Sequence, residues 1–179
     1  MKRVDPRRLV FIDESGANLA MGRSHAWVLP GEEYVEPRPM NWGDNLSLIG
    51  AVRLDGWVTL GTQWKAVKAP DFVAWVRHRL LPRLRPGDIV LLDNLRVHKA
   101  PVVQALIEGR GATLKFLPPY SHDFNPIEAV WALVKQYIRK LAPRTAATLR
   151  RVARAARHAV DPHHCHQFFA NAGYVISSA

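Results

Sequence analysis

The chain has 179 residues, which is long enough for one domain with a sizeable hydrophobic core. Hydrophobic residues make up 48% of it and no tract has low complexity, which excludes a disordered protein. The formal net charge of +10 favours a polyanionic partner, because Lys and Arg displace counterions from phosphates. We expect a single domain over 1–179, with a core at about 8–142 and a basic helical extension at about 143–179.

The cysteine content and the hydropathy pattern favour a soluble, intracellular protein. Cys165 is the one cysteine, so an intrachain disulfide is excluded, as is usual in a reducing cytoplasm. The N-terminal sequence MKRVDPRRLVFIDES has too short an apolar run for a signal peptide. No stretch approaches the roughly 20 apolar residues of a membrane span, so we expect a cytoplasmic protein.

The first part of the sequence predicts an antiparallel meander. Residues 8–13 form a short apolar run that ends in an aspartate, and the Glu-Ser-Gly after it indicates a break. A Gly- and Pro-rich loop follows to about residue 42, with one short strand at 26–29. Two partly β-branched runs, at 46–53 and 57–62, are separated by Leu-Asp-Gly, whose Asp-Gly pair is a strong hairpin signal.

The next part predicts helices that alternate with parallel strands. A helix covers 71–84 with Pro70 in its first turn, and the apolar run at 88–92 is typical of a strand buried on both faces. A helix at 99–108, a glycine-rich stop and a strand at 113–117 then complete one right-handed crossover unit.

The longest helix is predicted to follow Asn125, which suits the N-cap position, while Pro126 suits the first helical position. Hydrophobic residues at the 3.6-residue period form its buried stripe: Ile127, Val130, Trp131, Val134, Ile138 and Leu141. A second helix at 145–160 carries four arginines, and a short apolar tail at 166–176 closes the chain.

Asp88, like other acids in turns, is interpreted as a local cap.

Three acids stand where these elements would bring them together. Asp13 ends the first strand, Asp93 ends the fourth strand, and Glu128 lies in the first turn of the long helix. Each acid alone is better explained as a strand-end or helix-N-terminal carboxylate, but three carboxylates at one point repel unless cations bind, which implies Mg²⁺ or Mn²⁺. Two such ions about 4 Å apart support phosphodiester hydrolysis or strand transfer.

The strings FIDES, LLDNLRVHKA and LPPYSHDFNPIEAVWALVK resemble the three motifs of the Asp-Asp-Glu transposases of bacterial insertion sequences related to mariner elements. Thirty-four residues separate Asp93 from Glu128, the spacing typical of this group. The resemblance implies a ribonuclease H-like α/β fold, with a mixed five-stranded sheet (three antiparallel strands, then two parallel) and helices on both faces. It identifies Asp13, Asp93 and Glu128 as the catalytic triad that binds two Mg²⁺ or Mn²⁺ ions.

The function implied by this resemblance is metal-dependent cleavage of DNA at transposon ends and strand transfer into target DNA, by a homodimer at the bacterial nucleoid. Family members normally carry an N-terminal helix-turn-helix region, which this sequence lacks. We therefore expect a catalytic domain alone, either a second reading frame that works with an upstream helix-turn-helix polypeptide or a truncated remnant. His122 follows Tyr120-Ser121 where the family usually has Pro, a change that loosens a loop and removes no ligand.

Several residues beside the acids are candidates for the edge of the site. Asn94 and His98 match the Asn and His that follow the second aspartate in the family. Asn94 either orients a metal-bound water or forms a turn, and His98 either polarises a phosphate or caps the next helix. The remaining candidates near the motifs are Glu14, Tyr120, Ser121 and Asn125.

Basic residues near the C-terminus are candidates for DNA binding. Residues 129–160 contain eight Lys or Arg and no acid, which favours a face that follows phosphates, with a solvated helix surface as the other interpretation. The DNA-binding candidates are Lys135, Arg139, Lys140, Arg150, Arg151, Arg154 and Arg157. The His-His-Cys-His string at 163–166 is disfavoured as a zinc site, because consecutive residues of a helix cannot all point at one ion.

Two other functions stay open from the sequence. A junction- or hybrid-cleaving nuclease of the ribonuclease H-like superfamily would share the carboxylates. A domesticated or truncated remnant would bind DNA without cutting it. The sequence has neither a G-x-x-x-x-G-K-[ST] loop nor a G-x-S-x-G elbow, which disfavours nucleotide hydrolases and serine hydrolases.

Overall fold

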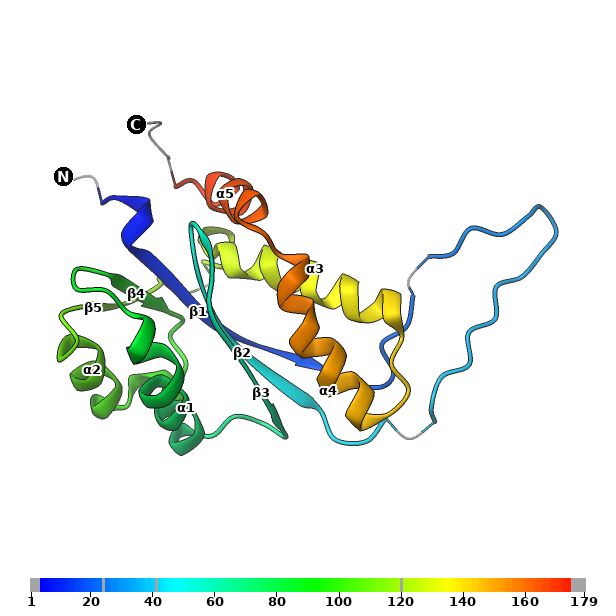
Figure 1. Cartoon of the computed structure of the whole chain (residues 1–179), viewed down its shortest axis with the longest axis horizontal. Helices are drawn as coiled ribbons and strands as arrows, with labels where there is room; N and C mark the ends of the chain where they lie inside the picture. The colour runs from blue at the N-terminus through cyan, green and yellow to red at the C-terminus, as the bar shows by residue number, and fades with distance from the viewer. Residues whose placement is uncertain (1–3, 24, 41, 120, 175–179) are drawn as a thin grey trace.

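One mixed sheet organises the fold in a computed structural model of the chain, which describes residues 4–23, 25–40, 42–119 and 121–174. The strands are β1 (Leu9–Ala17), β2 (Leu46–Arg53), β3 (Gly56–Trp64), β4 (Ile89–Leu92) and β5 (Thr113–Phe116). Their order in the sheet is β3-β2-β1-β4-β5 (Figure 1). β1, β2 and β3 are antiparallel neighbours, whereas β4 pairs in parallel with β1 and with β5. The predicted meander, the two parallel strands and the α/β class are confirmed.

β1 is longer than predicted. It does not break after Asp13 but continues to Ala17, because residues 13–17 pair with residues 46–50 of β2. Glu-Ser-Gly favours a turn only when considered alone, and the antiparallel ladder overrides that local preference. The predicted hairpin between β2 and β3 is confirmed, and Gly56 adopts a φ of 122° there, a value that side chains disfavour.

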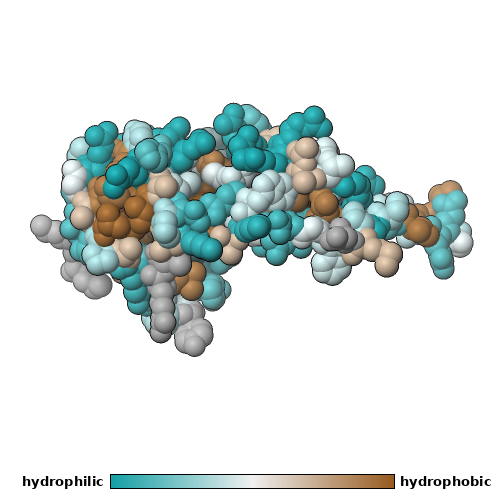
Figure 2. Space-filling view, turned by 90° about the horizontal axis from the view of Figure 1, so that it is seen from below, coloured by the Kyte–Doolittle hydropathy of each residue, from teal (hydrophilic) through white to brown (hydrophobic). Residues whose placement is uncertain are grey.

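The segment between β1 and β2 projects away from the sheet (Figure 1). The strand predicted at 26–29 is wrong, because these residues have no regular secondary structure. The segment is joined to the body by an ion pair between Glu36 and Arg144, at 2.8 Å. Figure 2 shows hydrophobic side chains on this projection. The large hydrophobic residues exposed on it include Trp27, Val28, Leu29, Val35 and Met40.

Helices cover both faces of the sheet. α3 (Pro126–Leu141), α4 (Ala146–Ala155) and α5 (Pro162–Asn171) lie on one face, and α1 (Ala69–Trp75) and α2 (Pro101–Glu108) lie on the other (Figure 1). The shorter helical turns are η1 (Pro6–Arg8), η2 (Val76–Leu80), η3 (Leu81–Arg83), η4 (Arg96–Lys99), η5 (His122–Phe124) and η6 (Ala156–Ala159). In the described part of the chain, no helix is both long enough and apolar enough to cross a membrane.

Two helix predictions need correction. The single helix predicted at 71–84 is divided into α1, a π-helical turn (η2) and a 3-10 turn (η3). Residues 166–171 of the apolar tail predicted at 166–176 are helical, because α5 extends to Asn171, and residues 175 and 176 lie outside the described residues. Asp161 starts α5 by accepting a hydrogen bond from the backbone N–H of His164 at 2.8 Å, a local signal that the sequence contains.

Alternating residues of β1 divide the core into two layers. Leu9 and Phe11 pack under α3 and α5, and Val10 and Ile12 pack under α1 and α2. α3 buries five of the six residues of its predicted stripe, each of which stabilises the fold by about 1.5–3 kcal/mol. The sixth, Leu141, is 49% exposed, because it is the last residue before the left-handed C-cap of the helix. This burial fixes the position of the first turn of α3.

Asp88 is more than a local cap. It accepts a hydrogen bond from the backbone N–H of Arg85 at 2.8 Å, as a turn residue does, but its carboxylate also forms a buried ion pair with Arg53 at 2.5 Å. The pair joins the end of β2 to the start of β4. Removing one partner would leave a buried, uncompensated charge, at a cost of about 3–5 kcal/mol.

Candidate active site

The register of β1 and β4 places two aspartates at the same edge of the sheet. The last parallel pair is Phe11 with Leu91, and Asp13 and Asp93 each lie two residues further along. Asp93 directly follows β4, as predicted. Asp13 lies inside β1 rather than at its end, but it still reaches the carboxyl edge of the parallel pair, because β4 stops there and β1 continues.

Glu128 approaches this edge from the first turn of α3. Its backbone N–H donates to the carbonyl of Asn125 at 3.1 Å, which anchors the turn. Its side chain is 47% exposed and lies 3.5 Å from His122. Burial, followed by the negative charges of Glu128 and Asp93, raises the pKa of Asp13 to about 7. Asp13 therefore interacts with both other carboxylates, and their negative charges oppose its ionisation.

Trp131 of α3 orients the side chain of Asp13. The indole Nε1–H donates to Oδ2 of Asp13 at 3.1 Å, and the ring is almost fully buried. The Trp131 ring packs beside Trp57 of β3, with 5.6 Å between ring centroids, and both rings lie against Gly50 of β2. A residue expected only to fill the core therefore also orients one of the acids.

His98 joins Asp93 to Glu14. Its Nδ1 lies 2.5 Å from Oδ1 of Asp93, its Nε2 lies 3.3 Å from Oε1 of Glu14, and its side chain is fully buried. The ring packs against Phe72 of α1, with 4.5 Å between centroids. Burial alone would lower the pKa of His98, but the hydrogen bonds to Asp93 and Glu14 raise it to about 9. The imidazolium is therefore the neutral-pH form and donates to both acids.

The ionised form of Asp93 is favoured by the same contact. Burial would raise the pKa of Asp93, but the hydrogen bonds from His98 and from the backbone N–H of Leu95 lower it below its ordinary value. Both hydrogen bonds are made to Oδ1. The raised pKa of Asp13 favours its protonated form, whereas the lowered pKa of Asp93 favours its ionised form.

The other residues predicted at the edge of the site are Asn94, Tyr120, Ser121 and Asn125. Asn94 is exposed, and Ser121 donates to the carbonyl of Pro119 at 3.3 Å. Asn125 occupies the N-cap position as predicted, but its side chain makes no capping hydrogen bond, and its buried Oδ1 has no partner among the described residues. Tyr120 lies outside the described residues.

The donor set suits a hard divalent cation, although the acids are not gathered around a single point. Within the ranges that the structure describes, no three His, Cys, Asp or Glu side chains lie close enough to hold one ion. Asp13 is held by Trp131, Asp93 by His98 and Glu128 by His122. Carboxylate oxygens are nonetheless the ligands that Mg²⁺ and Mn²⁺ prefer, and a bound cation would favour the ionised form of Asp13 that burial and the neighbouring charges oppose.

The structure separates the basic residues that the sequence groups together. Arg150, Arg154 and Arg157 line a groove beside β3, together with Arg79 and Arg83, which the sequence did not indicate. The predicted residues that do not line this groove are Lys135, Arg139, Lys140 and Arg151. The two groups of cations come from segments about seventy residues apart, so no sequence pattern joins them.

Comparison with known proteins identifies similar sequences and folds. A family model described as DDE superfamily endonuclease matches residues 8–150. The Mos1 transposase paired-end complex with the left transposon end is similar at a TM-score of 0.69 and 18% identity, over 92% of this chain and 52% of that chain. The mariner Mos1 paired-end complex with Mg is similar at a TM-score of 0.68 and 19% identity, over 94% and 54%. A search of curated proteins found no match.

The separate catalytic domain of Mos1 mariner transposase is also similar, at a TM-score of 0.52 and 16% identity, over 96% of this chain and 85% of that domain. Together with the strand order, these similarities confirm the ribonuclease H-like fold. The chain spans about half the length of the Mos1 chains in the DNA complexes.

Proposed function

The chain belongs to the DDE superfamily endonuclease family, and we propose from that membership that it cuts DNA at transposon ends and joins the cut strand to target DNA. We assign Asp13, Asp93 and Glu128 as the catalytic, metal-binding residues. The observation that carries this assignment is the β1–β4 register, which places Asp13 and Asp93 at one sheet edge, where the negative charges of Glu128 and Asp93 add to the burial that raises the pKa of Asp13. Such coupling of acids on three separate elements is typical of a functional site.

Two Mg²⁺ or Mn²⁺ ions are the proposed cofactors. The similar Mos1 structures include paired-end complexes with Mg and with Mn, which supports a divalent cation. When bound, such ions activate a hydroxyl nucleophile and stabilise the leaving oxygen of a phosphodiester. Asp93 would use Oδ2, because His98 and Leu95 engage Oδ1. To bind the cation, the Glu128 carboxylate would leave its contact with His122. The Glu128 side chain is exposed enough to rotate in this way.

DNA is the proposed partner, bound by a homodimer and by an upstream helix-turn-helix polypeptide that would read the transposon ends. The paired-end and strand-transfer complexes named for Mos1 support assembly on DNA. The net charge of +10 supports a polyanionic partner independently.

Replacing Asp93 by Asn tests the assignment. We expect Mg²⁺-dependent nicking and strand transfer, measured with a DNA-reading region fused to the chain, to fall by about 100-fold or more, because a metal ligand is lost. Asp123→Asn is the matched control, since Asp123 lies in an exposed turn and is not one of the three acids. Undiminished activity of the Asp93 variant would remove the mechanism.

A junction- or hybrid-cleaving nuclease is the second candidate, because it would share these carboxylates. Cleavage of four-way junctions, RNA–DNA hybrids and inverted-repeat duplexes by the same preparation separates the two. Transposition predicts preference for the inverted-repeat duplex, whereas faster cleavage of junctions or hybrids would favour the second candidate.

A further inference from the structure

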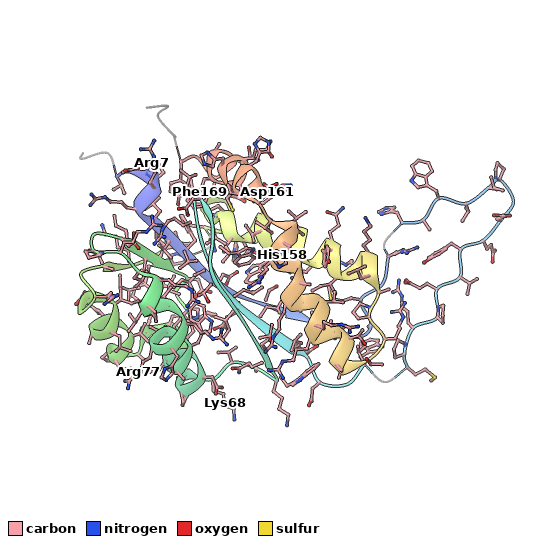
Figure 3. All side chains as sticks on the ribbon, in the orientation of Figure 1. Arg7, Lys68, Arg77, His158, Asp161 and Phe169 are labelled. Atoms are coloured by element: carbon pink, nitrogen blue, oxygen red, sulfur yellow. The ribbon has the colours of Figure 1, made fainter. Side chains whose placement is uncertain are left out.

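A cationic groove follows the outer edge of β3. It encloses about 650 Å³, and β3 is the edge strand of the sheet, so no neighbouring strand of the described chain covers it. η2 and η3 form one wall, and α4 and η6 form the other. The cationic and titratable residues that line it are Arg79, Arg83, Arg150, Arg154, Arg157 and His158. His158 belongs to η6, the turn that follows α4 (Figure 3). No Asp or Glu is among its lining residues.

Buried hydrogen-bond donors along this edge have no acceptor in the described part of the protein. Trp57 Nε1 and Arg150 Nε belong to residues that line the groove. Trp75 Nε1 belongs to an adjoining cavity of about 250 Å³, which shares Gly61 and Thr62 with the groove. A buried donor left unpaired costs about 1–3 kcal/mol. All three unpaired atoms are N–H groups, so the missing partner is an acceptor, which a buried water can supply.

We propose that this groove binds the phosphodiester backbone of the DNA strand that is presented to the acids, an assignment that rests on the proposed function. Arginine presents its N–H donors in a planar fork that matches phosphate oxygens. Five arginines without a carboxylate among them suit a ligand that carries a negative charge at every repeat.

The position of the groove favours a nucleic acid over an acidic peptide added to β3. Leu60 pairs with Gly50, and Gly50 pairs with Asp13, so the floor of the groove lies two strands from Asp13, about 10 Å away. Trp57 lines the groove and packs on Trp131, which donates to Asp13. The groove and Asp13 are therefore close enough for one extended DNA strand to span both, whereas binding of a peptide along β3 would not depend on the acids.

The first experiment compares Arg79→Gln/Arg154→Gln with the matched pair Arg7→Gln/Arg110→Gln, which removes the same charge from exposed arginines elsewhere. The probe is a fluorescein-labelled single strand of about 30 nucleotides, and affinity is measured by anisotropy in EDTA at several KCl concentrations. We expect the groove pair to lose about tenfold in affinity and to reduce the salt slope by about 1.4, since each phosphate contact contributes about 0.7. We expect the affinity of the control variant for the labelled strand to stay within about twofold of the wild-type affinity.

A cross-linking experiment locates the strand. Thr62→Cys places a thiol in the groove and Thr113→Cys places one on the opposite edge strand, while the native Cys165 is buried. An oligonucleotide with a disulfide tether should cross-link the Thr62→Cys variant at least about ten times faster, because local concentration sets the rate. Equal cross-linking of the two variants, together with equal affinities of the two arginine pairs, would overturn the proposal.

Competition measurements test whether inorganic phosphate or an acidic peptide binds the groove as well as DNA does. Inorganic phosphate should displace the labelled strand only at far higher phosphate concentration than unlabelled DNA does, because a strand makes several contacts at once. Displacement by a polyglutamate peptide as effective as displacement by DNA would assign the groove to acidic peptides and overturn the proposal. These measurements are made without divalent metal, so their outcome is independent of the Asp93→Asn nicking assay.

Discussion

Two ring N–H groups hold the two aspartates at the sheet edge. Trp131 donates to Oδ2 of Asp13 at 3.1 Å, and His98 contacts Oδ1 of Asp93 at 2.5 Å. Each contact engages one carboxylate oxygen and so fixes the orientation of the other. Both donors are buried, which makes these contacts part of the folded core rather than of a mobile surface.

We predict that Asp13→Asn stabilises the metal-free protein at pH 8. The pKa of Asp13 rises from 3.8 to about 7 on folding, so between these values the native state holds a proton that the unfolded state has lost. The stability from this group is complete below about pH 4 and is lost as the pH rises through about 7. The free energy of unfolding of the variant should exceed that of wild type by about 1–4 kcal/mol at pH 8, measured by urea denaturation in EDTA.

The control for this prediction is pH 4, where the variant and wild type should differ little, because Asp13 is then largely protonated when folded. His98 titrates in a different window: its stabilising contribution is complete below about pH 6.5 and is lost as the pH rises through about 9. Both proteins share that loss, so it cancels at any fixed pH. A variant no more stable than wild type at pH 8 would show that the site does not oppose ionisation of Asp13.

The sequence could place the aspartates but not the residues that hold them. An apolar run followed by an acid predicts a strand and its terminal carboxylate from local pattern alone. The Glu14–His98 contact joins residues 84 positions apart, and the Trp131–Asp13 bond joins residues 118 positions apart. Those contacts depend on how α1 and α3 pack on opposite faces of the sheet, which no local pattern contains.

Gly50 shows how β2 supports the site. A Cβ at this position would lie 2.7 Å from ring atoms of both Trp131 and Trp57. We predict that Gly50→Ala lowers the free energy of unfolding by about 1–3 kcal/mol, because a well-packed core must move to admit the methyl group. Nicking activity should fall as well, since displacing Trp131 disturbs its bond to Asp13.

Gly16→Ala in β1 is the matched control, because its Cβ would meet no atom within 4 Å. Thermal unfolding of both variants is the measurement. If the two variants unfold at the same temperature, the close packing of Trp131 on Gly50 does not contribute to stability.

The segment between β1 and β2 should be the first part of the chain to be cleaved by a protease. Trp27 is fully exposed and Tyr34 is 44% exposed, whereas Trp75 and Trp131 are buried. Brief chymotrypsin treatment should therefore cut at Trp27 or Tyr34 and leave the sheet and helices intact, as mass spectrometry of the fragments would show. A first cut inside α3 would contradict the described packing.

Some boundaries of helices and strands follow from local sequence signals, whereas others follow from pairing with distant parts of the chain. The Asp-Gly pair before β3 and the Asn-Pro pair before α3 mark element boundaries by themselves. The continuation of β1 to Ala17 depends on β2, which is distant in sequence, so its turn-like residues were misleading. The sequence pattern does not predict α5, because its His-rich sequence has weak helical periodicity, although Asp161 and Pro162 mark its start.

For the whole molecule, alternation of strands and helices was enough to predict the fold class. The sheet order follows from one hairpin, one crossover and the pairing of β1 with β4. The groove beside β3 could not be predicted, because η2–η3 and α4–η6 become neighbours only when both pack against the edge strand. The acids and the groove thus belong to one sheet, about two strands apart.

Calorimetric titration with Mn²⁺ tests the central claim, that Asp13, Asp93 and Glu128 form a metal site. Wild type should bind Mn²⁺ at pH 8 and about tenfold more weakly at pH 6, because Asp13, with a pKa of about 7, must release a proton to bind. Asp13→Asn and Asp93→Asn should abolish binding, and Asp123→Asn should leave it unchanged. A wild-type protein that takes up no Mn²⁺, or variants that bind as wild type does, would contradict the account.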